Sequence, residues 1–447
     1  MTETARGRSL LLAVSLTITY KFCSDILTYM NIYFSGIGGV GIGPLAQIAL
    51  DAGYQVCGSD KAVSSPLLIA LKERGVSISD TQDGAFLQVC HDAGAIDQFV
   101  YTSALPADHP ELVLAQQLGI KTVKRHELLN QIIREKNLKL IAIAGTHGKT
   151  TTTAMMVWLF KQLGLPVSYS IGTTLSFGTS GAYQQGSEYF IYECDEYDRN
   201  FLQFSPHLSL ITSIGYDHPD TYPTRADYTA AFRQFMLQSR HNIIWKDDGD
   251  KIQATANNGW ILQPDEVLQI HLAGAHNKRN ATLAAKAIEY IGKGSREEVV
   301  KFLQQFPGTA RRFEKLADNL YTDYAVHPAE IAATLSLARE FNDHVVVVYQ
   351  PHQNVRQHEV RKNYTDCFED AEEIYWLPTY LAREDPSLPI LSPAELSHNL
   401  TNKSAVHFAD LNDDLWNMIQ KARDAGTLVL CMGAGTIDKW LRDHLVI

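Results

Sequence analysis

The feature that most constrains the fold is a strand, a glycine turn and a helix start in residues 138–152, Leu-Lys-Leu-Ile-Ala-Ile-Ala-Gly-Thr-His-Gly-Lys-Thr-Thr-Thr. The apolar run Leu140–Ala144 has the length and composition of a buried parallel strand. It stops at Gly145, and the residues after Lys149 can continue as a helix. Backbone N–H groups at such a turn, together with the helix dipole, form an anion site. The segment therefore predicts an α/β fold with a phosphate-binding loop.

Two side chains of this loop have the chemistry that a bound nucleotide requires. Lys149 can reach terminal phosphates, and the Thr150 hydroxyl can hold Mg²⁺. The general phosphate loop has a glycine five residues before its Gly-Lys pair, whereas Ile143 occupies that place here and Gly145 lies only three residues before Gly148. The spacing is shorter than usual, and a simple glycine turn beside an exposed lysine is the alternative reading.

Composition narrows the class of protein. A chain of 447 residues is long enough for about two to four domains. Its formal net charge of -11 argues against a nucleic-acid surface. The six cysteines are scattered without a C-x-x-C pair, which predicts a reduced, cytoplasmic chain rather than a disulfide framework or a zinc site. Oligomeric state is not readable from the sequence.

Residues 1–29 form an unusual N-terminal extension. Arg6 and Arg8 precede an apolar run, residues 9–19, that resembles a short signal-peptide core and is too short to span a bilayer well. The extension could target the chain, pack as an extra helix or reflect a misassigned start. We favour the misassigned start, because Met30 opens a natural first strand. No other segment approaches the length of a membrane span.

A second glycine turn follows the first apolar strand, Asn31–Ser35, and precedes a helix, Pro44–Ala52. The turn carries a Gly-x-Gly-x-x-Gly pattern, at Gly36, Gly38 and Gly41. Asp60, after the next strand, is about where a ribose-binding carboxylate would fall. This unit predicts a nucleotide-type ligand without identifying it. A turn that only packs helix on strand and a dinucleotide oxidoreductase both stay open at this point.

Acidic and imidazole side chains follow two strands of the central region, Tyr189–Cys194 and Leu208–Ile214. The first strand ends in Glu193, and His218 lies just beyond the second. Ligands of doubly wound sheets collect at the carboxyl ends of strands, where Lys149 and Thr150 also lie. Hard Mg²⁺ prefers carboxylate and hydroxyl oxygens and tolerates a nitrogen. The shared placement of these side chains favours a metal site with Thr150, Glu193 and His218 as ligands, and the alternative is that Glu193 and His218 are ordinary surface residues.

Further alternation of strands and helices predicts three α/β domains. The strands are expected at residues 98–102, 121–123, 320–324, 344–349, 373–377 and 428–432, and the helices at residues 66–74, 111–118, 225–238, 277–291 and 328–341. The expected divisions are an extension (1–29), a first domain (30–136), a central domain (137–306) and a C-terminal domain (307–447).

Taken together, these stretches resemble the Mur ligases, the ATP-dependent amide-forming enzymes of peptidoglycan synthesis, over residues 30–447. The motifs that carry the resemblance are Phe34-Ser-Gly-Ile-Gly-Gly-Val-Gly, Tyr101-Thr-Ser-Ala, Ala144-Gly-Thr-His-Gly-Lys-Thr-Thr-Thr-Thr, Glu193-Cys-Asp-Glu-Tyr-Asp, Asp217-His218, His276-Asn277-x-x-Asn280, Gly308-x-x-Arg311-Arg312-Phe313, Asp323-Tyr-x-x-His327-Pro, Gln350-Pro-His and Gly433-Ala-Gly. The resemblance implies a Rossmann-like UDP-binding domain, a central P-loop ATPase-like domain and a C-terminal Rossmann-like domain.

The resemblance also implies roles for individual residues. Catalytic roles fall to Lys149, His327 and Arg312. The ATP site comprises Gly145, Thr146, His147, Gly148, Lys149, Thr150, Thr151, Asn277, Asn280, Arg312 and Asp323, with His276 in the same segment. The UDP-sugar site comprises Gly36, Gly38, Gly39, Val40, Gly41, Asp60, Ser103 and His218. The incoming amino acid or substrate would meet Arg356, Tyr380 and Glu384.

Within the family, the match is closest to the members that join L-alanine to the carboxylate of UDP-N-acetylmuramate through an acyl phosphate, with Mg²⁺ as cofactor and ATP as co-substrate. Departures at Val326, Gln353 and Asn354 leave the identity of the amino acid open, and a modified lysine near the metal is also open. The alternatives are a recycling ligase that adds the L-Ala-γ-D-Glu-diaminopimelate tripeptide to the same sugar and a non-catalytic UDP-sugar-binding protein.

Overall fold

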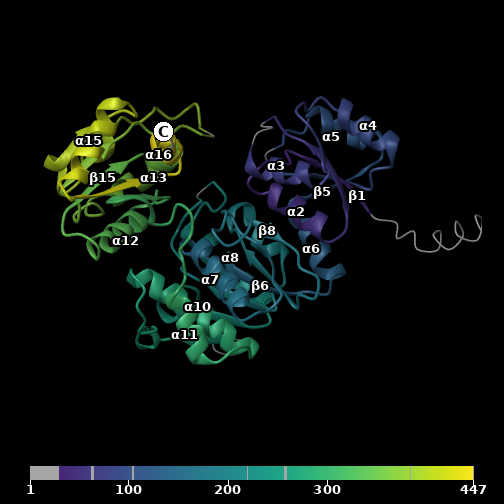
Figure 1. Ribbon diagram of the computed structural model, residues 1–447, viewed down its shortest axis with the longest axis horizontal. Coiled ribbons are helices and arrows are strands. Elements are labelled where there is room, and N and C mark those ends of the chain that lie inside the picture. Colours follow the sequence, from purple (N-terminus) through teal and green to yellow (C-terminus); the bar gives the residue numbers. More distant parts are fainter. Residues whose placement is uncertain are drawn as a thin grey trace, which may run out of the picture. The chain divides into compact units, whose positions relative to one another are not determined.

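The protein is described by a computed structural model that covers residues 30–61, 65–102, 105–218, 220–255, 259–382 and 384–445. The expectations for residues 1–29 and for Ser103 lie outside these ranges. The chain divides into two compact units between Arg125 and His126. The described residues form three sheets of five, seven and six strands, which confirms the predicted α/β class (Figure 1).

The first unit is a five-stranded parallel sheet in the order β3-β2-β1-β4-β5. Figure 1 draws α2 and α3 on one side of β1 and β5, and α4 and α5 on the other. The elements are β1 (Asn31–Ser35), α2 (Gly43–Asp51), β2 (Gln55–Ser59), α3 (Pro66–Glu73), β3 (Ser77–Ser79), α4 (Ala85–Ala93), β4 (Gln98–Tyr101), α5 (Pro110–Gln117) and β5 (Lys121–Lys124). From β1 the chain adds β2 and β3 on one side of the sheet and then β4 and β5 on the other. The turn after β1 therefore lies at the topological switch point, where sheets of this kind bind ligands.

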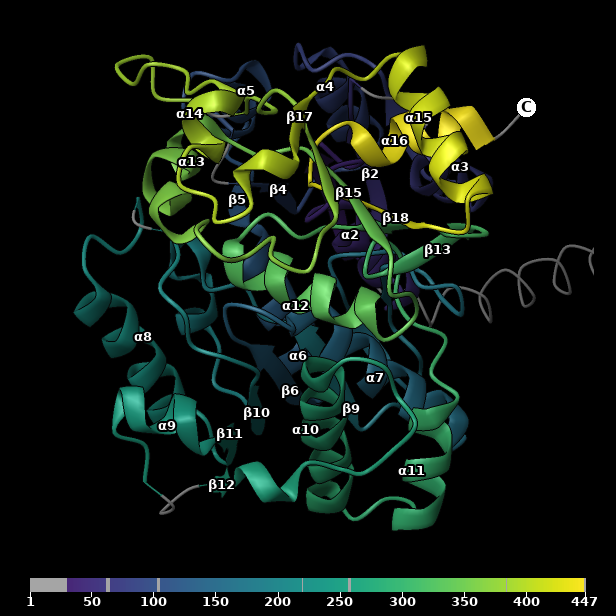
Figure 2. The same ribbon diagram turned by 90° about the vertical axis from the view of Figure 1, so that its left-hand side faces the viewer.

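The second unit opens with α6 (Arg125–Glu135) and contains the seven-stranded sheet β12-β11-β10-β6-β9-β7-β8. Its elements are β6 (Lys139–Ala144), α7 (Lys149–Gln162), β7 (Ser168–Ser170), β8 (Gly181–Ala182), β9 (Tyr189–Glu193), η1 (Tyr197–Gln203), β10 (Leu208–Ile211), α8 (Arg225–Gln238), β11 (Asn242–Trp245), α9 (Lys246–Ile252), β12 (Gly259–Leu262), η3 (Pro264–Glu266), α10 (Ala275–Ile291) and α11 (Arg296–Gln304). Helix α10 packs on α7 and α11, as Figure 2 shows. The apolar strand β6 lies between β10 and β9, with five of its six residues buried.

The same unit contains the six-stranded sheet β13-β14-β18-β15-β16-β17. Its elements are β13 (Glu314–Ala317), β14 (Leu320–Asp323), α12 (Pro328–Arg339), β15 (Val345–Tyr349), α13 (Asn354–Val360), η4 (Arg361–Asn363), β16 (Glu373–Trp376), α14 (Pro393–Ser397), η5 (Lys403–Ala405), β17 (Val406–Phe408), α15 (Asp413–Asp424), β18 (Leu428–Met432) and α16 (Ile437–Leu445). Only β13 runs antiparallel to its neighbour. The last strand, β18, occupies the middle of the sheet, and both β15 and β18 are buried along their whole length.

The predicted strands are all present, and one ends three residues earlier than expected. The strand predicted to reach Ile214 ends at Ile211. Its next residues leave the sheet because they hydrogen-bond to the phosphate loop: the Ser213 carbonyl accepts from the Thr146 N–H, and the Gly215 N–H donates to Thr146 Oγ1. Among the helices that the structure describes, none has the length and apolar character needed to cross a bilayer.

Candidate active site

The phosphate loop lies between β6 and α7, at the carboxyl edge of the central sheet. Gly145 has φ +140°, and a Cβ there would lie 2.2 Å from Thr212 Oγ1. Gly148 has φ +85°, and its Cβ would lie 2.8 Å from Asn280 Oδ1 on α10. Both positions need glycine because the backbone adopts positive φ and neighbouring groups approach closely. The two glycines of the short loop therefore both lie where neighbouring side chains leave no room for a Cβ.

The loop backbone is fixed by the segment after β10. The Thr146 N–H donates to the Ser213 carbonyl at 3.0 Å, and the His147 N–H donates to Ser213 Oγ at 2.9 Å. Thr146 Oγ1 lies 2.7 Å from the Gly215 carbonyl and 2.7 Å from the Tyr228 hydroxyl. These bonds hold the loop open as a cradle, while the first N–H groups of α7 stay directed into it.

Lys149 is held by a buried carboxylate that the sequence did not single out. Its Nζ lies 3.0 and 2.7 Å from the two carboxylate oxygens of Glu196, and it also donates to the Gly145 carbonyl. Glu196 has no exposed surface. Burial alone would lower the pKa of Lys149, but the carboxylates around it, Glu196 foremost, raise that pKa above its usual value. Lys149 is therefore a cation at neutral pH.

The carboxyl ends of β6 and β9 bring together two of the three predicted metal ligands. Thr150 Oγ1 donates to Glu193 Oε1 at 2.6 Å, and Glu193 Oε2 accepts from the Gly172 N–H at 2.7 Å. The third predicted ligand, His218, instead lies beside Glu196, with 3.7 Å between its Nε2 and Glu196 Oε1. His218 has φ +56°, an uncommon conformation for a non-glycine residue that turns its ring into the site.

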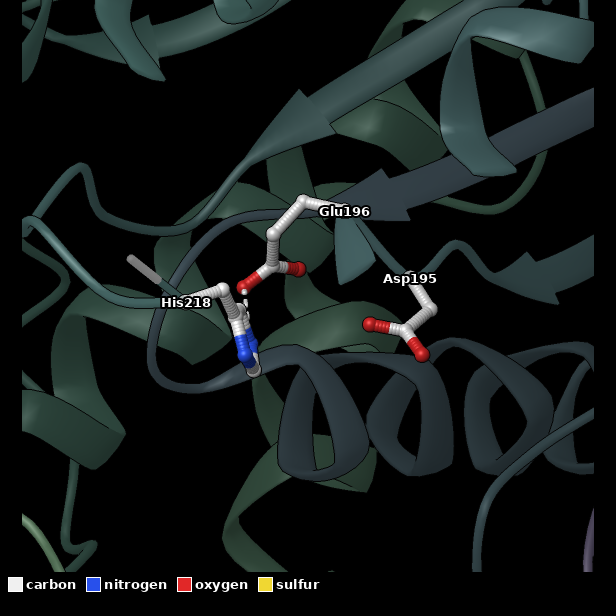
Figure 3. A group of neighbouring side chains, drawn as sticks. All are labelled: Asp195, Glu196 and His218. Carbon is white, nitrogen blue, oxygen red and sulfur yellow. Dashed lines mark ion pairs between the residues drawn. The ribbon is translucent and has the colours of Figure 1, made fainter. Parts of the chain in front are cut away.

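A second set of donors adjoins these residues. Asp195, Glu196 and His218 each offer one ligand atom, and these atoms lie within 4.8 Å of one another. Figure 3 shows the Glu196 carboxylate and the His218 imidazole facing each other, with Asp195 to one side. The acidic side chains here outnumber the one lysine, and the donors are carboxylate and hydroxyl oxygens with one imidazole. That chemistry fits a hard divalent cation.

A cavity of about 440 Å³ extends from the phosphate loop. One wall contains His147, Gly148, Thr150 and Thr151, and the opposite wall comes from helix α12 and the strand before it. Five further predicted nucleotide residues line the same cavity, namely His276, Asn277, Asn280, Arg312 and Asp323, whereas Gly145, Thr146 and Lys149 are not part of its lining. Burial lowers the pKa of His276, which keeps this imidazole neutral at pH 7. The cavity therefore gathers most of the predicted ATP residues around the loop.

The C-terminal wall of the cavity is ordered by Asp323 and His327. Asp323 is almost fully buried, and its two carboxylate oxygens accept from the Phe313 and Ala325 N–H groups, each at 2.7 Å. Burial raises the pKa of Asp323 to about 6. His327 caps α12 by accepting from the Ala329 N–H. Burial, followed by the charge of His147, lowers the pKa of His327, so its ring is neutral at pH 7.

Of the residues predicted for the incoming amino acid, Arg356 lies on α13, which follows β15, and Tyr380 and Glu384 lie in the loop after β16. Arg356 Nη2 lies 3.8 Å from Asp217 Oδ1. The Tyr380 ring stacks on His352, with 5.7 Å between centroids. Glu384 accepts from the Asn354, Val355 and Ala382 N–H groups at 2.9, 3.2 and 2.9 Å. Glu384 therefore anchors the start of α13, the helix that carries Arg356, and its contact with a substrate stays a prediction.

The departures noted in the sequence have defined structural roles. Asn354 is buried, and its amide donates to the Pro389 carbonyl while its Oδ1 accepts from the Leu391 N–H. Gln353 has φ +61° and precedes α13. Val326 is a buried residue of the turn before α12. Asn354 thus binds the segment after Tyr380 to α13.

In the first unit, the glycine turn closes on Asp60. The Gly38 N–H donates to Asp60 Oδ2 at 2.8 Å, and a Cβ on Gly41 would lie 2.2 Å from Arg125 Nη1. Gly36 has φ +73°. Gly39 and Val40 form the tip of the turn, and Val40 is exposed. The turn therefore has the close backbone approach that a phosphate needs, and an arginine stands beside it.

Sequence reasoning missed three carboxylates that organise these sites. Glu196 pairs with Lys149, and Glu330 lies 3.0 Å from His147. Glu111 is fully buried in the first unit, where it accepts from Tyr33 at 2.6 Å and from Ser35 at 2.6 Å. Glu196 stood in the quoted acidic run and could have been found there. Glu330 has the local pattern of a helix-capping residue only, and Glu111 carried no local signal of its partners.

Three family models match the chain in order. They are described as "Mur ligase family, catalytic domain" over residues 31–137, "Mur ligase middle domain" over residues 143–261 and "Mur ligase, glutamate ligase domain" over residues 311–435. A UDP-N-acetylmuramate–L-alanine ligase of Clostridium perfringens is 32% identical, covering 93% of this chain and 98% of its own. The ligase of the same name from Rhizobium meliloti is 30% identical over 92% of this chain and 95% of its own.

Solved structures show the same fold. The UDP-N-acetylmuramate-alanine ligase of Thermotoga maritima superposes with a TM-score of 0.74 at 24% identity, covering 93% of this chain and 98% of its own. A murein peptide ligase of Psychrobacter arcticus superposes with a TM-score of 0.64 at 22% identity and the same coverage. The fold of this chain is therefore similar to that of a UDP-N-acetylmuramate-alanine ligase and to that of a murein peptide ligase.

Proposed function

Because the chain belongs to the Mur ligase family, we propose that it uses ATP to join L-alanine to the carboxylate of UDP-N-acetylmuramate. The relatives that carry this activity in their names match nearly the whole chain at 30–32% identity. We assign UDP-sugar recognition to residues 30–136, ATP binding to residues 137–306 and amino-acid binding to residues 307–447. The free thiols of the five described cysteines fit a reducing compartment, and we place the reaction in the cytoplasm.

The chemistry begins with activation of a carboxylate, which is a poor acylating agent. Transfer of the ATP γ-phosphoryl group to that carboxylate gives an acyl phosphate and ADP. Attack by the amine of L-alanine then forms the amide and releases phosphate. Both steps build negative charge on oxygen, so they require fixed positive groups and N–H donors.

The residues of the second unit supply such groups. The first N–H groups of α7 and the Lys149 ammonium would contact the phosphates at the loop, and Arg312 lines the cavity that begins there. Thr150, Glu193 and His218, with Asp195 and Glu196 beside them, would hold Mg²⁺, which supplies charge stabilisation at the transferring phosphoryl oxygens. Neutral His327 can donate a hydrogen bond from Nε2, because its Nδ1 accepts from the Ala329 N–H.

One observation carries most of the proposal. A single cavity is lined both by the phosphate loop and by Arg312 and Asp323 of the C-terminal sheet region. A passive UDP-sugar-binding protein has no need of this cavity beside a phosphate loop whose Lys149 pairs with the buried Glu196. The cavity fits ATP-dependent catalysis.

The test is release of phosphate by the purified full chain in a coupled assay. We expect release only when UDP-N-acetylmuramate, ATP, Mg²⁺ and L-alanine are all present, with loss of the signal when any one is omitted. Preference for the L-Ala-γ-D-Glu-diaminopimelate tripeptide would overturn the alanine assignment and retain the ligase. No release with any amino acid or tripeptide would overturn the ligase itself.

A further inference from the structure

The carboxylate of Glu330 joins the two walls of the nucleotide cavity. Its Oε1 lies 3.0 Å from His147 Nδ1 on the phosphate loop. Its Oε2 accepts from the Val326 and His327 N–H groups at 3.2 and 3.4 Å, closing a capping box at the start of α12. One side chain therefore connects two elements that are 183 residues apart in the sequence.

The charge on Glu330 suits this bridging position. Burial would raise the pKa of its carboxyl, but His147 and Arg312, with the hydrogen bond from the Val326 N–H, hold that pKa well below its usual range. The carboxylate is thus ionised at neutral pH and accepts on both oxygens. His147 Nδ1 is consequently the donor of the 3.0 Å bond.

The ring of His147 depends on this contact more than its backbone does. The His147 N–H and carbonyl are bonded to Ser213 and Thr212, at 2.9 and 2.5 Å, within the central sheet region. Only the ring crosses to α12, where its centroid lies 5.0 Å from that of His327. Without Glu330 the ring would lose its partner, and the relative placement of His147 and His327 would no longer be fixed.

We propose that Glu330 is a positioning residue for the ligation, a role that rests on the function proposed above. It fixes the His147 ring against α12 and thereby sets the spacing between the phosphate loop and His327 when ATP fills the cavity. An ionised carboxylate repels phosphate oxygens, so Glu330 acts through His147 and not as a nucleotide ligand.

A double-mutant cycle between His147 and Glu330 tests the role. Glu330→Gln keeps the side-chain volume and one acceptor while removing the charge. We expect it to lower kcat/KM for ATP about tenfold in the wild-type background and less than about twofold in the His147→Ala background. Additive losses would mean that Glu330 only caps α12, and the proposal would be wrong.

A matched control separates capping from positioning. Glu298 closes the same kind of capping box on α11, where it accepts from the Ser295 N–H at 2.8 Å, and it lies outside the cavity lining. We expect Glu298→Gln to leave kcat/KM for ATP unchanged. A loss in Glu298→Gln equal to that in Glu330→Gln would trace the effect to helix capping and overturn the proposal.

The same cycle can be read without turnover, from the affinity of the full chain for a non-hydrolysable ATP analogue measured by calorimetry. We expect Glu330→Gln to weaken the analogue several-fold only when His147 is present. Absence of phosphate release by the wild-type chain would defeat the proposed function. Additive losses in analogue affinity would instead defeat the role of Glu330, so the two failures are distinguishable.

Discussion

Lys149 Nζ lies 2.7 Å from Glu196 Oε2, and Glu196 is completely buried. The lysine that we propose as a phosphate ligand is therefore also the partner of a carboxylate that has no access to water. Breaking a buried ion pair by removing one partner leaves the other charge uncompensated, which costs about 3–5 kcal/mol. We therefore expect Lys149 to matter both for catalysis and for stability, and the loop motif alone did not indicate the effect on stability.

Lys149→Met should abolish phosphate release and also destabilise the protein by a few kcal/mol. The role of Lys149 at the phosphate loop accounts for the loss of turnover, and its buried partner Glu196 accounts for the loss of stability. Chemical denaturation gives the stability and the coupled phosphate assay gives the turnover. Turnover within tenfold of wild type would mean that the loop does not bind the reacting phosphates.

The double variant Lys149→Met/Glu196→Gln is the control for that change. It removes both charges, so we expect it to recover most of the lost stability and none of the activity. If stability stays at the level of the single variant, the Lys149–Glu196 pair is not the source of the loss.

Gly145→Ala should disrupt the phosphate loop in two ways, through backbone strain at a positive φ and through steric overlap of the added Cβ with its neighbours. An added Cβ would lie 2.2 Å from Thr212 Oγ1 and 2.9 Å from the Ser213 nitrogen, so the segment after β10 must move. Gly164 has φ +67° with open space around it and is the matched control, for which only the backbone strain of about 1–2 kcal/mol is expected. We expect ATP affinity to fall at least tenfold in Gly145→Ala and to stay unchanged in Gly164→Ala. Equal affinities would show that the crowding at Gly145 is unimportant.

Glu193→Gln should raise the Mg²⁺ concentration needed for half-maximal turnover by at least about tenfold, because a neutral amide is a far weaker ligand for a hard cation. The other end of the same strand supplies the control: Glu188 is half-exposed and pairs with Lys139 at 2.7 Å. Magnesium titrations of phosphate release compare Glu193→Gln with Glu188→Gln. An unchanged Mg²⁺ requirement in Glu193→Gln would remove Glu193 from the metal site.

Asp323 should make stability depend on pH. Burial raises its pKa to about 6, above the ordinary value of an aspartate, so the native state binds this proton more tightly than the unfolded state. The contribution to folding is then complete below about pH 4 and is lost as the pH rises through 6, by roughly 3 kcal/mol in all. Urea unfolding of wild type and Asp323→Asn between pH 4 and 7 measures this. We expect the difference in free energy of unfolding to shift in favour of the asparagine variant as pH rises, and a constant difference would contradict the raised pKa.

The elements that sequence could predict are those with a local signal. Apolar runs such as Leu140–Ala144 and residues 428–432 gave buried strands, and the glycine turns gave the two ligand loops. The end of β10 was wrong by three residues, because Thr146 on another strand's loop draws Ser213 and Gly215 out of the sheet. A contact of that kind has no counterpart in local composition.

Within the candidate site, the residues of the loop and of the cavity could be named from motifs, whereas their partners could not. Glu330 meets His147 across 183 residues and reads in sequence only as a helix-capping residue. Glu384 illustrates the converse. Glu384 was predicted to contact the substrate. In the structure its carboxylate accepts three backbone N–H groups, two of them at the start of α13, and the sequence carries no signal of these hydrogen bonds.

The position of β18 has a consequence for the order of events during synthesis. This strand lies between β14 and β15 in the C-terminal sheet, yet it is the last strand of the described chain to leave the ribosome. Until Met432 has emerged, β13–β14 and β15–β17 are two separate fragments, each with an unpaired edge that another chain could join. A nonsense mutation between Phe408 and Leu428 would therefore leave the strands of this sheet in two pieces, β13–β14 and β15–β17, without the strand that joins them.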